Sequence, residues 1–250
     1  MKQIFFTLCV FIAFITSANA GEVYRCIGRD GNKIITDNPQ DGMTKCVLME
    51  SHVEAPSPGK STYANNSSGL IKGIAPIRQS QRVNNLCATA SAEMVLKYYG
   101  RTDLDQYEIG KSVCGMVEEY KRKYPDSDPK PCIWPNYPET YQPILAQYIR
   151  NLGFNIKNTR TKFNQSSGVV DEERIVEFMS FVKQGIPTIV HVEGHYLLVV
   201  GYDDDNQKLF YNDPANGKRM EVSYLDFFNR NNGWYKGRKG WDGRFLSIWK

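Results

Sequence analysis

Hydrophobic and polar positions separate a helical half of the chain from a strand-rich half. The strongest helical pattern begins at Cys87 and ends at Gly100, where glycine adopts the left-handed conformation that terminates helices. Its apolar residues run almost all the way round the helix: Ala88, Ala90, Ala92, Met94, Val95, Leu96, Tyr98 and Tyr99. A helix that is apolar on every side is buried inside a domain. We therefore expect this helix to be the centre of the fold.

Other patterns predict a sheet beside this helix. Further helical stretches cover 107–123, 140–152 and 171–184, with a short helical turn at 224–228. Apolar runs bounded by turn residues predict strands at 154–159, 186–192, 195–202, 208–212 and 245–249. Tight turns between consecutive strands favour antiparallel pairing. The pattern therefore predicts an α+β fold, with the buried helix packed on an antiparallel sheet.

The first twenty residues have a different character. Lys2 precedes an apolar run over residues 4–15, and Ala18-Asn19-Ala20 provides a cleavage site of small residues. The apolar run is short for a membrane anchor and typical of a secretory signal peptide. No later stretch is apolar for long enough to span a bilayer. We predict that residues 1–20 are removed and that the protein is periplasmic or secreted, without stable membrane insertion.

Residues 21–50 form a separate small unit. Two alternating stretches, 22–26 and 33–37, flank a turn at 29–32 and predict a β-hairpin. The pattern resembles a small β-domain found at the N-terminus of many exported Gram-negative proteins. Residues 51–72 are rich in Pro, Ser, Asn and Gly, a composition typical of a linker. The main domain is therefore predicted to cover residues 73–250.

Export makes the cysteine count informative. Of the six cysteines, Cys9 leaves with the signal peptide, and an odd number remains for an oxidising compartment. Local pairing would join Cys26 to Cys46 and Cys114 to Cys132. Four cysteines allow three pairings, so this connectivity is one of three. The local pairing leaves Cys87, the first residue of the central helix, as a free thiol.

Charge and composition limit the classes of molecule that the protein is expected to bind. The net charge is +4 and the isoelectric point is near 8.6, with Lys and Arg scattered along the chain. This distribution does not indicate nucleic-acid binding. The cysteine spacings match no zinc motif. The predictions therefore include no metal and no cofactor, and the oligomeric state is left open.

The candidate chemistry starts from Cys87. A cysteine in the first helical turn lies where free N–H groups and the helix dipole favour a thiolate. Gln81, six residues earlier, carries an amide that can donate to an oxyanion beside the sulfur. A thiol nucleophile also needs a base and a group that orients it. His195 opens a predicted strand after Gly194, and Asp213 ends its antiparallel partner, so both should lie at one rim of the sheet.

Other residues could take these roles. His191 is the rival base, although it lies inside a strand, whereas His52 belongs to the linker. Asn212 or Asp204 could orient the imidazole in place of Asp213, because Asp-Pro sequences often only cap turns. A cysteine in an apolar helix is also frequently an inert core residue.

Taken together, these motifs resemble the papain-like cysteine peptidases, in particular the bacteriocin-processing (double-glycine leader) peptidase-like group. The resemblance covers residues 73–250. It rests on Gln81 before Cys87, on the Gly-His-Tyr-Leu-Leu-Val-Val-Gly-Tyr-Asp segment and on Asn-Asp-Pro-Ala-Asn-Gly. It implies that Cys87 is the nucleophile, His195 the base and acid, and Asp213 its orienting partner. It also implies an oxyanion hole made by Gln81 and the Cys87 N–H. The group usually has Cys-Gly-Pro at the nucleophile, whereas this chain has Cys87-Ala88-Thr89.

The resemblance implies a peptide or protein substrate and hydrolysis through a thioester. Two alternatives stay open. The same three residues could serve a cell-wall amidopeptidase or a toxin-like amidase. The domain could instead be a non-catalytic binding module that uses the aromatic and basic segment 233–241, a composition that is usually typical of a solvated loop.

Overall fold

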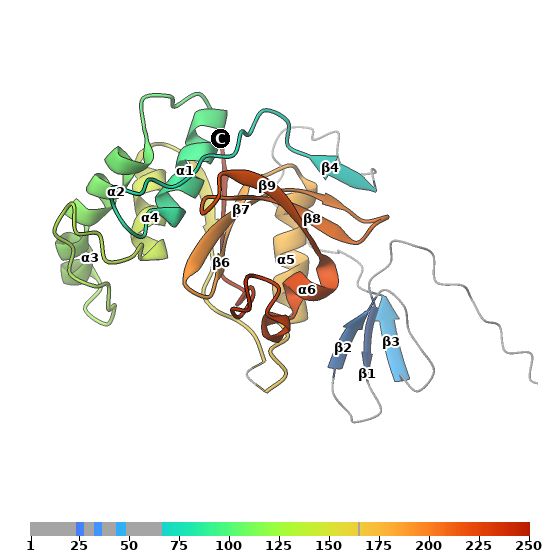
Figure 1. Ribbon diagram of the computed structural model, residues 1–250. Helices are drawn as coiled ribbons and strands as arrows, with labels where there is room; N and C mark the ends of the chain where they lie inside the picture. Colours follow the sequence, from blue (N-terminus) through green and yellow to red (C-terminus); the bar gives the residue numbers. More distant parts are fainter. Residues whose placement is uncertain (1–23, 28–32, 37–43, 49–66, 165) are drawn as a thin grey trace, which may run out of the picture.

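The computed structural model of the protein describes residues 24–27, 33–36, 44–48, 67–164 and 166–250, with side chains from residue 67 onward (Figure 1). A small sheet contains β1 (Tyr24–Ile27), β2 (Lys33–Thr36) and β3 (Thr44–Leu48) in the order β2-β1-β3, all antiparallel. The first two strands match the predicted hairpin, whereas the third had no prediction. Residues 1–20, the turn at 29–32, His52 and the sulfur atoms of Cys26 and Cys46 lie outside the described part.

The large sheet has the order β5-β10-β6-β7-β8-β9, with β4 paired to β7, and every pairing is antiparallel. Its strands are β4 (Ser68–Leu70), β5 (Asn155–Asn158), β6 (Thr188–Val192), β7 (His195–Asp203), β8 (Lys208–Asp213), β9 (Lys218–Ser223) and β10 (Phe245–Trp249). The five strands predicted for this half of the chain are all present. The α+β prediction is therefore confirmed.

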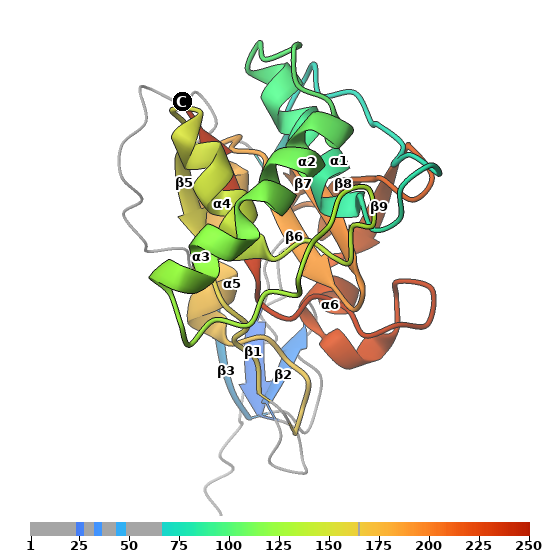
Figure 2. The ribbon, with the colours of Figure 1, turned by 90° about the vertical axis from the view of Figure 1, so that its left-hand side faces the viewer.

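Helices cover both faces of this sheet (Figures 1 and 2). They are α1 (Cys87–Tyr98), α2 (Gln106–Gly115), α3 (Val117–Lys123), α4 (Gln142–Asn151), α5 (Glu172–Lys183) and α6 (Tyr224–Phe228), followed by a 3₁₀ turn at Arg230–Asn232. Among the described residues, no helix has the length and apolar character needed to cross a membrane.

One helical prediction is corrected. The stretch 107–123 was expected to be a single helix, but α2 ends at Gly115 and α3 starts at Val117. Glycine is among the poorest helix formers, and here Gly115 is the last residue of α2, directly before the break at Met116.

The apolar run of β7 is explained by burial on both sides. Tyr196, Leu198 and Val200 pack in the core that contains α1, α2 and α4. The alternate residues Leu197 and Val199 pack in the second core, beneath α5 and α6. Successive side chains of a strand point to opposite faces, so two helical layers require an unbroken apolar sequence. The strand therefore holds a fixed position between both layers.

The main domain starts earlier than the predicted linker boundary at residue 72. Ser68–Leu70 pairs with β7 as β4. A Cβ atom on Gly201 would come within 2.4 Å of the Gly69 carbonyl oxygen, so this strand contact requires glycine at position 201. The sequence did not predict β4, because the strand contains only three residues and lies in a stretch with the composition of a linker.

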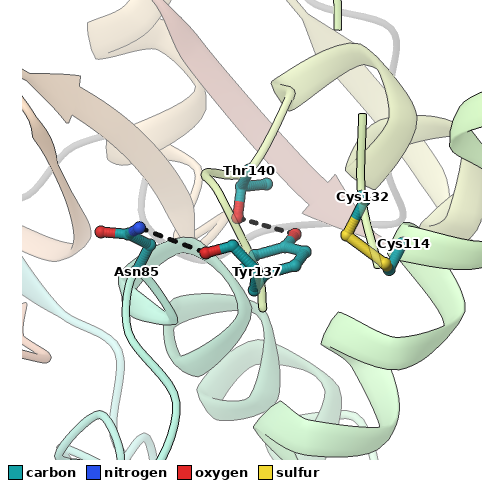
Figure 3. The surroundings of a disulfide bond; sticks show 5 residues. All are labelled: Asn85, Cys114, Cys132, Tyr137 and Thr140. Atoms are coloured by element: carbon teal, nitrogen blue, oxygen red, sulfur yellow. Dashed lines mark hydrogen bonds between the residues drawn. A yellow bond between two sulfur atoms is a disulfide. The ribbon is translucent and has the colours of Figure 1, made fainter. Parts of the chain in front are cut away.

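A long connection between α3 and α4 is fixed at two points (Figure 3). A disulfide joins Cys132 in this connection to Cys114 in α2, which confirms that predicted pairing. Near its other end, the Asn85 side chain donates hydrogen bonds to the carbonyl oxygens of Tyr137 and Pro138. The side chain of Tyr137 in this connection is buried in the same core as Cys87.

We predict that replacing both Cys114 and Cys132 by Ser lowers the free energy of unfolding by about 3 kcal/mol, the chain-entropy value for a loop of this length. The two residues are 18 positions apart in the sequence. Urea unfolding of oxidised wild type and variant measures the difference. The difference should disappear when both proteins are compared under reducing conditions, and its persistence there would contradict the disulfide as the cause.

Candidate active site

Cys87 occupies the first position of α1 and is the free cysteine of the described residues. The first N–H–to–carbonyl bond of the helix runs from Ala90 to Leu86, so the N–H groups of the three preceding residues have no intrahelical acceptor. No side chain caps this end. A buried sulfur therefore lies beside unpaired backbone donors, a setting that suits a negative charge.

His195 and Asp213 meet at one rim of the large sheet. Gly194 turns β6 into β7 with φ of +69°, and His195 is the first residue of β7. Asp213 is the last residue of β8, the neighbouring strand. The His195 Nε2 atom lies 2.8 Å from Asp213 Oδ1, and both side chains are buried. The antiparallel hairpin thus brings together two residues that are 18 positions apart in the sequence.

Asp213 is held as an anion. Its Oδ1 also accepts a hydrogen bond from the Ala215 N–H at 2.8 Å, and the Tyr235 hydroxyl donates to Oδ2 at 3.2 Å. Burial alone would raise the pKa of this carboxyl group. The hydrogen bonds from His195 and the Ala215 N–H outweigh burial and lower the pKa below its usual value.

His195 also interacts with Cys87, which favours the protonated imidazole. Since Nε2 is bonded to Asp213, Nδ1 is the ring nitrogen available to the sulfur. Burial acts to lower the pKa of His195, but the interactions with Asp213 and Cys87 prevail and raise it to about 9. The imidazole therefore keeps its proton at neutral pH, between a carboxylate and the sulfur.

Tyr235 completes this group, although no sequence pattern assigned it a role. Its ring stacks on the His195 ring at a centroid distance of 5.2 Å and an interplanar angle of 10°. Segment 233–241, interpreted as a solvated loop or an aromatic contact surface, instead buries Tyr235 and Trp241. Tyr235 therefore contributes to the site, and Trp241 contributes to the core. The available signal was an aromatic pair, Trp234-Tyr235, in an otherwise polar segment.

The alternative orienting residues lie elsewhere. Asn212 is fully buried and bonds the Arg219 side chain and the Ile74 carbonyl oxygen. Asp204 pairs with Lys183 and accepts from the Tyr224 hydroxyl. Neither has a described contact with His195.

Gln81 is placed less tightly than the other candidates. It lies in the segment before α1, its side chain is exposed, and it has no hydrogen bond with any described residue. The structure brings together Cys87, His195 and Asp213. The oxyanion role of Gln81 stays a prediction.

An open cavity of about 1340 Å³ gives access to the sulfur. Cys87, Gly194 and Tyr196 line it together with the connection between α3 and α4. Tyr120, Tyr124 and Tyr141 add an aromatic wall whose rings contact one another. The disulfide and the Asn85 hydrogen bonds therefore hold one side of the cavity that leads to Cys87.

The rival base, His191, belongs to a second cluster in the same cavity. Its Nδ1 atom lies 3.0 Å from Asp242 Oδ2, and Arg244 contacts both residues. Burial and the positive charge of Arg244 lower the pKa of His191, despite the hydrogen bond to Asp242. This histidine is therefore neutral at pH 7, and no contact joins it to Cys87. Within the described residues, no group of three or more His, Cys, Asp or Glu side chains could hold a metal ion.

An α+β fold with a free thiol at a helix N-terminus, which interacts with a hydrogen-bonded histidine–carboxylate pair, is compatible with a cysteine peptidase. Residues 71–239 match the model of the Peptidase_C39 like family, and the chain belongs to that family. No curated protein sequence matches the chain. The family supports a papain-like cysteine peptidase.

We predict that Tyr235→Ala lowers the pKa of His195 from about 9 toward its ordinary value of 6.5. The reason is that removal of the ring lets water reach the His195–Asp213 pair and weakens it. Tyr235→Phe keeps the stacked ring and loses only the hydroxyl, so its change should be much smaller. Titration of the His195 imidazole signals by NMR measures both, with His191 as the internal control. Equal His195 pKa values in all three proteins would contradict the shielding role.

Proposed function

We propose that this protein is an exported cysteine peptidase that hydrolyses peptide bonds through Cys87, His195 and Asp213. The single observation that carries the proposal is the buried His195–Asp213 hydrogen bond together with a free, buried thiol that interacts with the same imidazole. A structural cysteine in a core needs neither a charged imidazole nor an open cavity beside it.

The proposed reaction is acyl transfer. The Cys87 thiolate attacks the carbonyl carbon of the substrate, while the Cys87 N–H and Gln81 stabilise the oxyanion. Protonated His195 gives its proton to the leaving amine as the C–N bond breaks, which leaves a thioester. Water, deprotonated by His195, then attacks the thioester, releases the acid and restores the starting pair. Asp213 keeps the imidazole oriented and stabilises its charge.

Substrate and location extend the proposal. A signal peptide at residues 1–20 would deliver the domain to the periplasm or the exterior, with residues 21–50 as a small disulfide-stapled domain. Peptides or proteins are the substrates of the family that the chain resembles, and a double-glycine leader peptide is the first one to test. Cys87-Ala88-Thr89, in place of Cys-Gly-Pro, favours a cleavage specificity distinct from that of the leader peptidases.

We expect iodoacetamide to label Cys87 rapidly at mildly acidic pH in the wild type and slowly in His195→Ala, because the imidazolium stabilises the thiolate. His52→Ala is the matched control and should label like the wild type. Peptide mass mapping locates the label. An equally slow thiol in wild type and His195→Ala would contradict the proposal.

The same preparations identify the substrate. Products from a peptide library, casein, a double-glycine leader peptide and peptidoglycan should appear with wild type and be absent with Cys87→Ala. Asp213→Asn should reduce the rate at least about 100-fold. Cleavage of peptidoglycan alone would replace the peptidase with a cell-wall amidopeptidase.

Hydrolysis should decline as the pH rises through about 9, because His195 must carry a proton to release the amine. The sign follows from the raised pKa: the protonated state is complete below the ordinary value of 6.5 and is lost at about 9. Initial rates measured over this pH range give the alkaline side of the pH–rate profile. A decline centred near 6.5 would show that the Asp213 bond does not hold the proton.

A further inference from the structure

Arg244 is a charged residue that lines the cavity and has no part in the proposed reaction. It lines the same cavity as Cys87, and about a third of its side chain is exposed (32%). It directly precedes β10, whose partner β6 carries His191. Arg244 is therefore placed at the rim of the sheet that also carries His195.

The backbone around Arg244 is fixed in place. The Trp241 indole N–H donates to the Arg244 carbonyl oxygen at 2.8 Å, and the Arg244 N–H donates to Asp242 Oδ1 at 3.1 Å. Gly243 between them has φ of +83°, and a Cβ atom there would lie 2.6 Å from the Lys162 carbonyl oxygen. This conformation and this close approach both require glycine. The turn therefore holds the arginine before any ligand arrives.

The guanidinium group is also oriented. Its Nε and Nη2 atoms both donate to Asp242 Oδ2, at 2.9 and 2.8 Å, and Nη2 contacts the His191 ring. Nη1 has no hydrogen-bond partner among the described residues. Asp242 is almost fully buried, and the bonds from His191 and Arg244 lower its pKa to about 2 against the effect of burial. Asp242 and His191 thus hold the Nε and Nη2 groups of the arginine and leave Nη1 without a hydrogen-bond partner among the described residues.

Tyr196 connects this cluster to the thiol. It pairs with His191 across β6 and β7, and the two rings are in edge contact at 4.9 Å. The charges of both Cys87 and Arg244 act on the Tyr196 hydroxyl. Cys87, Tyr196 and Arg244 therefore line one cavity, in which a substrate at the sulfur can also reach the arginine.

We propose that Arg244 binds a carboxylate of the substrate beside Cys87, which makes it a specificity-determining residue of the peptidase function proposed above. A partly exposed guanidinium whose Nη1 group has no partner among the described residues can donate a charge-assisted hydrogen bond to a carboxylate. The carboxylate belongs either to the C-terminus of a peptide or to an Asp or Glu side chain near the cleaved bond. Glu139, which lines the same cavity, is paired with Lys130.

Affinity labels for Cys87 test the inference without a known substrate. N-bromoacetylglycine and N-bromoacetyl-β-alanine carry a terminal carboxylate, and N-bromoacetylglutamic acid α-amide carries a side-chain carboxylate. Each is compared with its neutral amide. In every case the sulfur forms a thioether with the methylene carbon, and bromide leaves with the bonding electrons.

We expect at least one acid to label Cys87 faster than its amide, and the acid-to-amide ratio to fall about tenfold or more in Arg244→Gln, the size of a charged hydrogen bond. Arg244→Lys should retain only part of the ratio because its ammonium group is not a planar fork. Arg160→Gln is the matched control, because Arg160 is an exposed cation of the same cavity. Its ratio should equal that of the wild type.

A double variant, Arg244→Gln with Asp242→Asn, removes both charges of the buried pair and covers the case in which Arg244→Gln alone fails to fold. The acid that reacts faster identifies the source of the carboxylate. An acid-to-amide ratio that is unchanged in the Arg244 variants, or that falls equally in Arg160→Gln, would overturn the inference.

A second measurement is independent of the thiol. In Cys87→Ala, the corresponding N-acetyl acids should raise Tm above the values with their amides, and this increase should be lost when Arg244→Gln is added. An unreactive Cys87 with this increase present counts against the peptidase but supports the carboxylate site. A reactive Cys87 without the increase, and without an acid preference, counts against the site alone.

Discussion

The site depends on a charged pair, His195 and Asp213, that is kept out of water. Two opposite charges in a buried place are stable only when hydrogen bonds satisfy both groups. Here the Ala215 N–H and the Tyr235 hydroxyl satisfy the carboxylate, and the sulfur of Cys87 lies on the other side of the imidazole. The geometry is set by the β7–β8 hairpin, so the register of that hairpin determines whether a proton can be held next to the thiol.

The register itself is secured by burial on both faces of β7. A shift of one residue would exchange the side chains that face α1 with those that face α5 and would ruin both cores. The β7–β8 pairing is irregular between Val199 and Gly201, where β4 approaches closely on the other side of β7. Two apolar layers thus fix the position of a polar pair at the end of the strand.

The sequence was informative wherever a feature depended on nearby residues. The turn at Glu193-Gly194 and the turn after Asp213 located the start of β7 and the end of β8. Cysteine counting with local pairing predicted the 114–132 bridge and the free Cys87. The edge strand β9 was missed because four of its six residues are exposed and only two of the six, Met220 and Val222, are apolar. Tyr235 was missed because its partner lies 40 positions earlier and no local pattern records that stacking. Contacts between distant segments leave little trace in hydrophobic periodicity.

The two histidines at this rim lie only a few residues apart, yet His195 is protonated at neutral pH and His191 is neutral. Each has a buried carboxylate partner, Asp213 for His195 and Asp242 for His191. The difference lies in the third member: the sulfur beside His195 raises its pKa, whereas the guanidinium of Arg244 lowers that of His191. A carboxylate that is hydrogen-bonded to an arginine raises the pKa of a nearby imidazole less, because the positive guanidinium disfavours a second positive charge. The cation therefore leaves His195 as the only described histidine suited to hold a proton for the thiol, and it places a neutral, hydrogen-bonding ring beside the arginine.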